Sequence, residues 1–116
     1  MERNCKNTKV LEMARELSTA IVTSEAYRYR DLAWAQIKQD TCKVEVLQEY
    51  MGRSEALQIK RLQGVPVTFE DEASLSLLYS DLCASTKCKA YLDAESRLAE
   101  MLAKVYEIFS SSIKYP

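Results

Sequence analysis

The stretch Lys87–Lys114, KCKAYLDAESRLAEMLAKVYEIFSSSIK, decides the fold of this chain. It has no Gly or Pro, and its apolar residues recur at alternating intervals of three and four, which places them on one stripe of an α-helix. Such a helix would be roughly 40 Å long, whereas a compact chain of this length has a radius of gyration of about 13 Å. Another long helix, from this chain or from a second copy, must cover the stripe, because isolated amphipathic helices are marginal in water. The predicted core and oligomer stripe is Tyr91, Leu98, Met101, Leu102, Val105 and Phe109.

The rest of the chain also favours helices, with only two Gly and two Pro among 116 residues. We expect one all-α domain over residues 1–116, an elongated antiparallel bundle of about five helices in which the third and the last are long. We also expect a dimer, and the short break at Ser85 and Thr86 permits segment swapping between copies. Apolar spacing predicts the first four helices over residues 8–21, 25–39, 40–63 and 69–84.

Capping residues support these boundaries. Ser24, Asp40 and Thr68 are expected N-caps, and Gly64 is suited to end the third helix. Gly52 is the exception, because an interior Gly costs about 1 kcal/mol relative to Ala. A kink at Gly52, or a close crossing by another backbone, is therefore expected.

Composition disfavours several classes of function. Sixteen Lys and Arg residues balance seventeen acids, so no overall field attracts nucleic acid or an anionic membrane. No apolar run approaches the ~20 residues of a membrane span, and the charged start lacks the apolar core of a signal peptide. The chain has no His, which removes the commonest general base and a common zinc ligand. These features favour a cytoplasmic, non-enzymatic protein that needs no cofactor.

The four cysteines leave alternatives open. In a cytosolic chain with an adequate core, free thiols are the leading interpretation. Cys83 and Cys88 are separated by four residues across a predicted helix break, so they are weak candidates for a metal or iron-sulfur site, or for a redox disulfide. A complete ligand set would need Cys5 and Cys42 as well. A cysteine-based iron-sulfur or metal redox sensor is the alternative function.

Glu95 falls within the apolar stripe, where an unpaired carboxylate would be costly. A Lys or Arg from a facing helix, or a Tyr hydroxyl, is expected to hold it as a buried polar group. The candidate cations are Lys60, Arg61, Arg28 and Arg30. A contact with a partner protein, an exposed edge of the stripe and a general acid or base role are the alternatives.

Two charge clusters stand at predicted helix ends. Glu70, Asp71 and Glu72 lie in the first turn of the fourth helix, and Lys60 and Arg61 lie in the last turn of the third. Each cluster has the sign that the helix dipole favours. Helix capping explains both clusters, and the alternative for the basic pair is an anionic-ligand site.

Several short motifs, in this order and spacing, resemble the YlbF/YmcA family, which includes the YheA-like proteins of Gram-positive bacteria. The resemblance extends from about Val10 to Ile113. The motif residues are Ser24, Glu25, Ala26 and Tyr27, then Ile37 and Asp40, then Gly64 and Thr68, and above all Tyr91, Leu92, Asp93, Ala94, Glu95 and Leu98.

The resemblance implies a small cytoplasmic helical protein that forms homodimers or larger assemblies and has no known catalytic activity. YlbF and YmcA act with a third protein in competence, sporulation, biofilm development and mRNA processing by RNase Y. The iron-sulfur clusters of that complex are held partly by cysteines near C-terminal tails, and this chain has no cysteine after Cys88. The resemblance therefore favours a YheA-like regulatory protein that binds further copies of itself and a protein partner.

Overall fold

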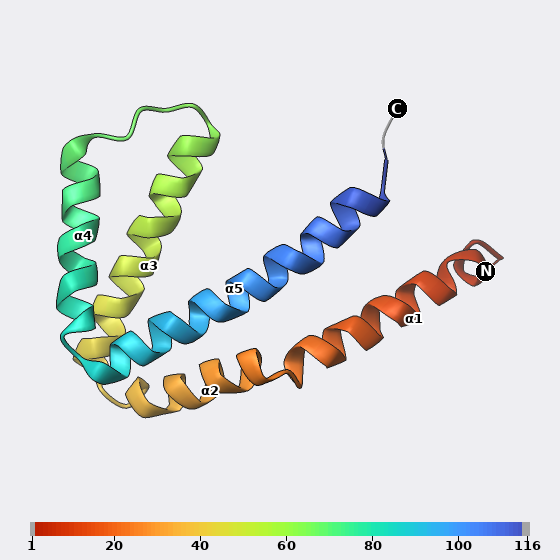
Figure 1. Cartoon of the computed structure of the whole chain (residues 1–116), viewed down its shortest axis with the longest axis horizontal. Coiled ribbons are helices and arrows are strands. Elements are labelled where there is room, and N and C mark those ends of the chain that lie inside the picture. Colours follow the sequence, from red (N-terminus) through yellow and green to blue (C-terminus); the bar gives the residue numbers. More distant parts are fainter. Residues whose placement is uncertain (1, 115–116) are drawn as a thin grey trace. The chain divides into compact units, whose positions relative to one another are not determined.

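The computed structural model describes residues 2–114, with side chains from residue 7 onward, and this part of the chain contains helices and no strands (Figure 1). The all-α class is confirmed, as are the five helices and the length of the third and the last, which have 22 and 27 residues. The helices are α1 (Glu2–Val22), α2 (Glu25–Ile37), α3 (Thr41–Leu62), α4 (Phe69–Cys83) and α5 (Thr86–Ser112).

Helix α1 begins earlier than predicted, at Glu2 and not at residue 8. The charged residues that precede Val10 carry no apolar period, so the sequence pattern gave no helix signal there. No Gly or Pro interrupts them, and the helical backbone therefore extends over them.

Side-chain caps fix the starts of the other four helices. The backbone N–H three residues further on donates to the side-chain oxygens of Ser24, Asp40, Thr68 and Ser85 at 3.3, 3.2, 3.1 and 3.4 Å. Each bond satisfies a donor that the first turn of a helix leaves without an intrahelical partner. The expected caps at Ser24, Asp40 and Thr68 are confirmed, and so is the break before α5.

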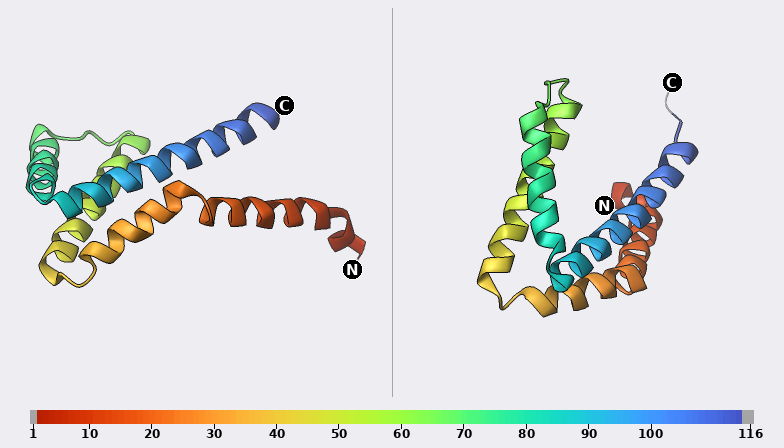
Figure 2. Two further views of the ribbon diagram at one scale, coloured as in Figure 1. Left: turned by 60° about the horizontal axis from the view of Figure 1, so that its bottom comes forward. Right: turned by 60° about the vertical axis from the view of Figure 1, so that its left-hand side comes forward.

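The chain divides into two compact units. The terminal unit comprises residues 1–31 and 94–116, and the central unit comprises residues 32–93. Helices α2 and α5 each belong to both units, with one end of the helix in the terminal unit and the other end in the central unit. Within the central unit, α3 and α4 lie side by side as an antiparallel hairpin in all three views (Figures 1 and 2).

The central unit contains a hydrophobic core. Side chains from the end of α2, from α3, from α4 and from the start of α5 meet there. The rings of Trp34 and Tyr91 lie 5.6 Å apart between centroids in a tilted arrangement, a favourable geometry for an aromatic pair. The buried core residues are Ile37, Leu47, Leu82, Cys88, Tyr91 and Leu92.

The turn between α3 and α4 is held by its own backbone and side chains. Gly64 has a φ of +74°, a conformation that favours glycine. Its N–H donates to the Arg61 carbonyl at 3.2 Å, and the Val65 N–H donates to the Lys60 carbonyl at 2.9 Å. These two bonds form a Schellman motif, which ends α3.

On the other side of this turn, Thr68 and Asp71 form a reciprocal capping box that starts α4. Two ion pairs link the helices, Lys60 with Asp71 at 3.4 Å and Arg61 with Glu72 at 3.1 Å. The turn is therefore a defined structure at the end of the hairpin.

Helix α3 continues through Gly52 without a break. A Cβ atom built at Gly52 would meet no described atom within 4 Å. The expected close crossing is therefore wrong within this chain, because the space beside Gly52 is open.

The two glycines predict opposite effects of one substitution. Gly52→Ala should raise the free energy of unfolding by about 0.5–1 kcal/mol, because Ala loses less backbone entropy in a helix interior and fits the open space. Gly64→Ala should lower it by about 1 kcal/mol, because an L-residue is strained at positive φ. Urea denaturation of both variants measures the two changes, and a loss of stability in Gly52→Ala would contradict the helix assignment.

Candidate interaction surface

The predicted stripe of α5 is unevenly covered. Tyr91 lies in the core of the central unit, and Leu98 in the terminal unit is only 5% exposed. Further along the helix, Leu102 is 43% and Phe109 46% exposed. The two remaining stripe residues, Met101 and Val105, are half-buried. The stripe therefore begins in a packed core and ends as apolar surface.

Helix α1 contributes apolar side chains of its own to the terminal unit. Val10 and Met13 are exposed, whereas Leu17 and Ile21, further along the same side, are half-buried. Their spacing of three and four places them on one side of the helix. We call the α1–α5 apolar surface the set of these α1 residues together with the exposed Leu102 and Phe109 of α5 and Ile113, which follows the last residue of that helix.

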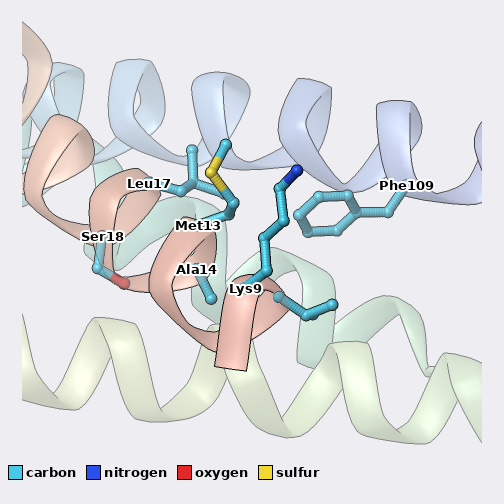
Figure 3. Close-up of a pocket in the computed structure, with 7 residues that line it drawn as sticks. Lys9, Met13, Ala14, Leu17, Ser18 and Phe109 are labelled. Atoms are coloured by element: carbon cyan, nitrogen blue, oxygen red, sulfur yellow. The ribbon is translucent and has the colours of Figure 1, made fainter. Parts of the chain in front are cut away.

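A groove of roughly 850 Å³ opens within this surface. Figure 3 shows Met13 and Leu17 of α1 together with Phe109 of α5, and Lys9 beside the Phe109 ring. Val10, Ala14 and Ser18 complete the lining. Apolar side chains predominate, so the groove offers shape and apolar contact and presents few groups for orienting a small polar molecule.

Glu95 is held by one of the four expected cations. Arg30 of α2 lies 3.7 Å from it, both residues belonging to the terminal unit. The Glu95 side chain is 30% exposed, so it is half-buried. The Arg30 guanidinium also lies 4.5 Å from the centroid of the Tyr27 ring. Arg30 thus joins α2 to α5 by an ion pair and packs on an aromatic face, a structural arrangement.

Two of the three remaining candidates, Lys60 and Arg61, are engaged elsewhere. Lys60 and Arg61 pair with Asp71 and Glu72 across the α3–α4 turn. The pKa of Asp71 is lowered, first by the hydrogen bonds from the Thr68 side chain and backbone and then by Lys60. Since both cations already have acidic partners, the anionic-ligand interpretation of this basic pair has no geometric support.

The three described cysteine thiols occupy different environments. Cys42 is exposed, Cys83 is half-buried and Cys88 is in the central core, and all three are free thiols. The side chain of Cys5 lies outside the described residues. A hydrogen bond with Cys83 is the main cause of a raised pKa of the Tyr79 hydroxyl. Among the described side chains, no three Cys, Asp or Glu residues gather as metal ligands would.

The site prediction from sequence contained the α5 half of the surface and omitted the α1 half. The apolar spacing of Val10, Met13, Leu17 and Ile21 was visible, yet spacing shows only that a helix has an apolar side. Whether that side is buried or left open depends on the rest of the fold.

None of the described helices is both long and apolar enough to cross a bilayer. The model of the family described as "Control of competence regulator ComK, YlbF/YmcA" matches residues 10–114. No solved structure matches the chain significantly.

Similar bacterial proteins carry the name UPF0342 protein. That of Caldicellulosiruptor bescii is 30% identical over 106 residues, covering 91% of this chain and 89% of the relative. That of Symbiobacterium thermophilum is 30% identical over 100 residues, covering 86% and 89%. That of Bacillus cereus is 23% identical over 103 residues, covering 89% and 87%.

The capping box predicts a pH-dependent stability. The lowered pKa of Asp71 means that its ionised form stabilises the fold above the unfolded pKa of about 3.9, and that this contribution is lost as pH falls through the lower folded value. Asp71→Asn should therefore lower Tm at pH 7 and differ little from the native chain well below pH 3. Thermal unfolding across this pH range measures the effect, and an equal difference at every pH would contradict it.

The Arg30–Glu95 pair predicts different effects of two substitutions. Glu95→Gln keeps an acceptor for Arg30 and should cost less than about 1 kcal/mol of stability. Glu95→Leu should cost more, because the guanidinium then loses that acceptor. Denaturant unfolding of both variants, with Arg30→Gln to complete a double-mutant cycle, measures the coupling. Equal losses in the Gln and Leu variants would show that the retained acceptor does not contribute at this position.

Proposed function

This chain belongs to the YlbF/YmcA family, whose description is the control of the competence regulator ComK, and we propose that it is a non-enzymatic, cytoplasmic regulatory protein. It acts through contacts with further copies of itself, in a homodimer or a larger homo-oligomer, and with a regulatory protein partner. Nucleic acid and membranes are not its direct ligands in this proposal, in keeping with the near-neutral net charge of −1.

The observation that carries the proposal is the α1–α5 apolar surface. Soluble monomers rarely expose large contiguous apolar patches, and such patches commonly mark protein interfaces. Leu102 and Phe109 continue a stripe that is buried at Leu98, so the same helix passes from core to open apolar surface. A covering protein chain would remove this surface from water and stabilise the terminal unit.

The form of the groove favours a protein over a small ligand. Small-molecule sites usually enclose most of the ligand and carry a few precisely placed polar groups. The groove beside Met13 and Phe109 is open, and among the described residues its polar side chains are Ser18 and Lys9. These are features of a helix-packing surface.

The alternative of a cysteine-based sensor has less support. Cys88 is enclosed in the central core, whereas Cys42 is exposed. A metal or cluster site would need further ligands brought to Cys83 and Cys88, and the described side chains do not supply a group of three.

If the chain forms an oligomer through the α1–α5 apolar surface, the mass of the particle in solution should fall when a charged residue is placed on that surface. The native chain at micromolar concentration should have the mass of two or more chains, and Met13→Glu or Phe109→Glu should shift it towards one chain, since a carboxylate would be desolvated in the interface. Size-exclusion chromatography with light scattering measures the mass, and circular dichroism checks that helicity is retained.

Leu77→Glu is the matched control, because Leu77 is an exposed apolar residue of α4 in the central unit and lies outside the proposed surface. It should leave the mass unchanged. A fully helical native monomer at micromolar concentration would contradict the oligomer.

A further inference from the structure

The end of the α3–α4 hairpin exposes large apolar side chains on a well-defined turn. Leu62, the last residue of α3, is 87% exposed, and Phe69, the first residue of α4, is 85% exposed. Val65 between them is also exposed. These three residues are called here the hairpin tip.

The tip is organised before it meets any partner. The Schellman motif at Gly64, the capping box at Thr68 and the two ion pairs between the helices fix the backbone on both sides of it. A preorganised segment loses little conformational entropy on binding. The exposed Leu62 and Phe69 side chains are therefore suited to enter an apolar recess.

The α1–α5 groove is a recess of matching chemistry on the same polypeptide. Its lining is mostly apolar, and Lys9 stands beside Phe109 in it (Figure 3). Lys9 forms no ion pair with another described residue. Glu70, next to Phe69, likewise lacks an ion pair among the described residues, unlike Asp71 and Glu72. The free charge beside the tip is thus opposite to the charge beside the groove.

The area argues for two such contacts in one assembly. An aromatic side chain buries about 150–250 Å² when it is fully covered. Leu62 and Phe69, together with a similar area of the groove wall that they cover, would therefore remove on the order of 800 Å² from water. That is below the roughly 1,200–2,000 Å² of a stable specific interface, whereas two contacts fall within this range. Two copies that exchange tips would form a closed two-fold dimer.

We infer that the α1–α5 groove of one copy takes the hairpin tip of a second copy, Leu62 and Phe69 entering beside Met13 and Phe109, in a reciprocal two-fold dimer. This inference rests on the proposed homo-oligomer and specifies what covers its apolar surface. Lys9 of one copy then faces Glu70 of the other.

A complementation experiment tests the arrangement. The tip variant carries Leu62→Ser and Phe69→Ser, and the groove variant carries Met13→Glu. Each variant alone has lost both contacts, so its dimer dissociation constant should rise at least tenfold in sedimentation velocity. An equimolar mixture keeps one intact contact, the tip of the groove variant in the groove of the tip variant, and should associate more tightly than either variant alone.

Controls keep the outcomes separate. Circular dichroism shows whether each variant is folded, and Leu62→Ala with Phe69→Ala replaces the tip variant if the Ser changes reduce helicity. Leu77→Ser should leave association unchanged, since Leu77 lies in neither surface.

Different failures have different meanings. If the groove variant dissociates while the tip variant keeps the native mass, the oligomer stands and the tip inference is overturned. If both variants dissociate but their mixture gains nothing, tip and groove do not face one another, which also overturns it. If the native chain is a monomer, the proposed function fails with it.

Discussion

The constraint on which this structure depends is the continuity of the α5 stripe. One helix supplies Cys88, Tyr91 and Leu92 to the core of the central unit and then continues into the terminal unit. Because no Gly or Pro occurs in α5, no helix-breaking residue stops the helix where the central core ends. The terminal unit therefore receives apolar side chains for which its other helices provide only partial cover, as the exposure of Leu102 and Phe109 shows.

The two units consequently differ in how they reach stability. The central unit has a core in which Ile37 and Leu47 are almost completely buried, and its hairpin is reinforced by caps and ion pairs. The terminal unit buries Ala94 and Leu98 and leaves much of its apolar side open. Since hydrophobic burial is the dominant favourable term in folding, the terminal unit has the greater need of a covering chain. An interaction role suits a protein whose stability is divided in this way.

Charges contribute to geometry more than to chemistry in this chain. Arg30 with Glu95, and Lys60 with Asp71, each join two helices at a half-exposed position. Pairs at such positions contribute little free energy, and here each one links two helices. The hairpin tip is an example. The ion pairs Lys60–Asp71 and Arg61–Glu72 link the helices beside the turn, and the apolar side chains of Leu62 and Phe69 remain exposed.

Apart from the first residues of α1, the sequence by itself determined the helices, because their signals are local. Apolar spacing, the caps at Ser24, Asp40 and Thr68, and the Gly64 stop each act within a few residues. Only the tertiary structure decided that Arg30 and not Lys60 pairs with Glu95, and that no neighbour crosses at Gly52. It also decided which apolar sides remain open, since burial depends on residues distant in the chain, and a periodic pattern is the same for a covered helix and an uncovered one.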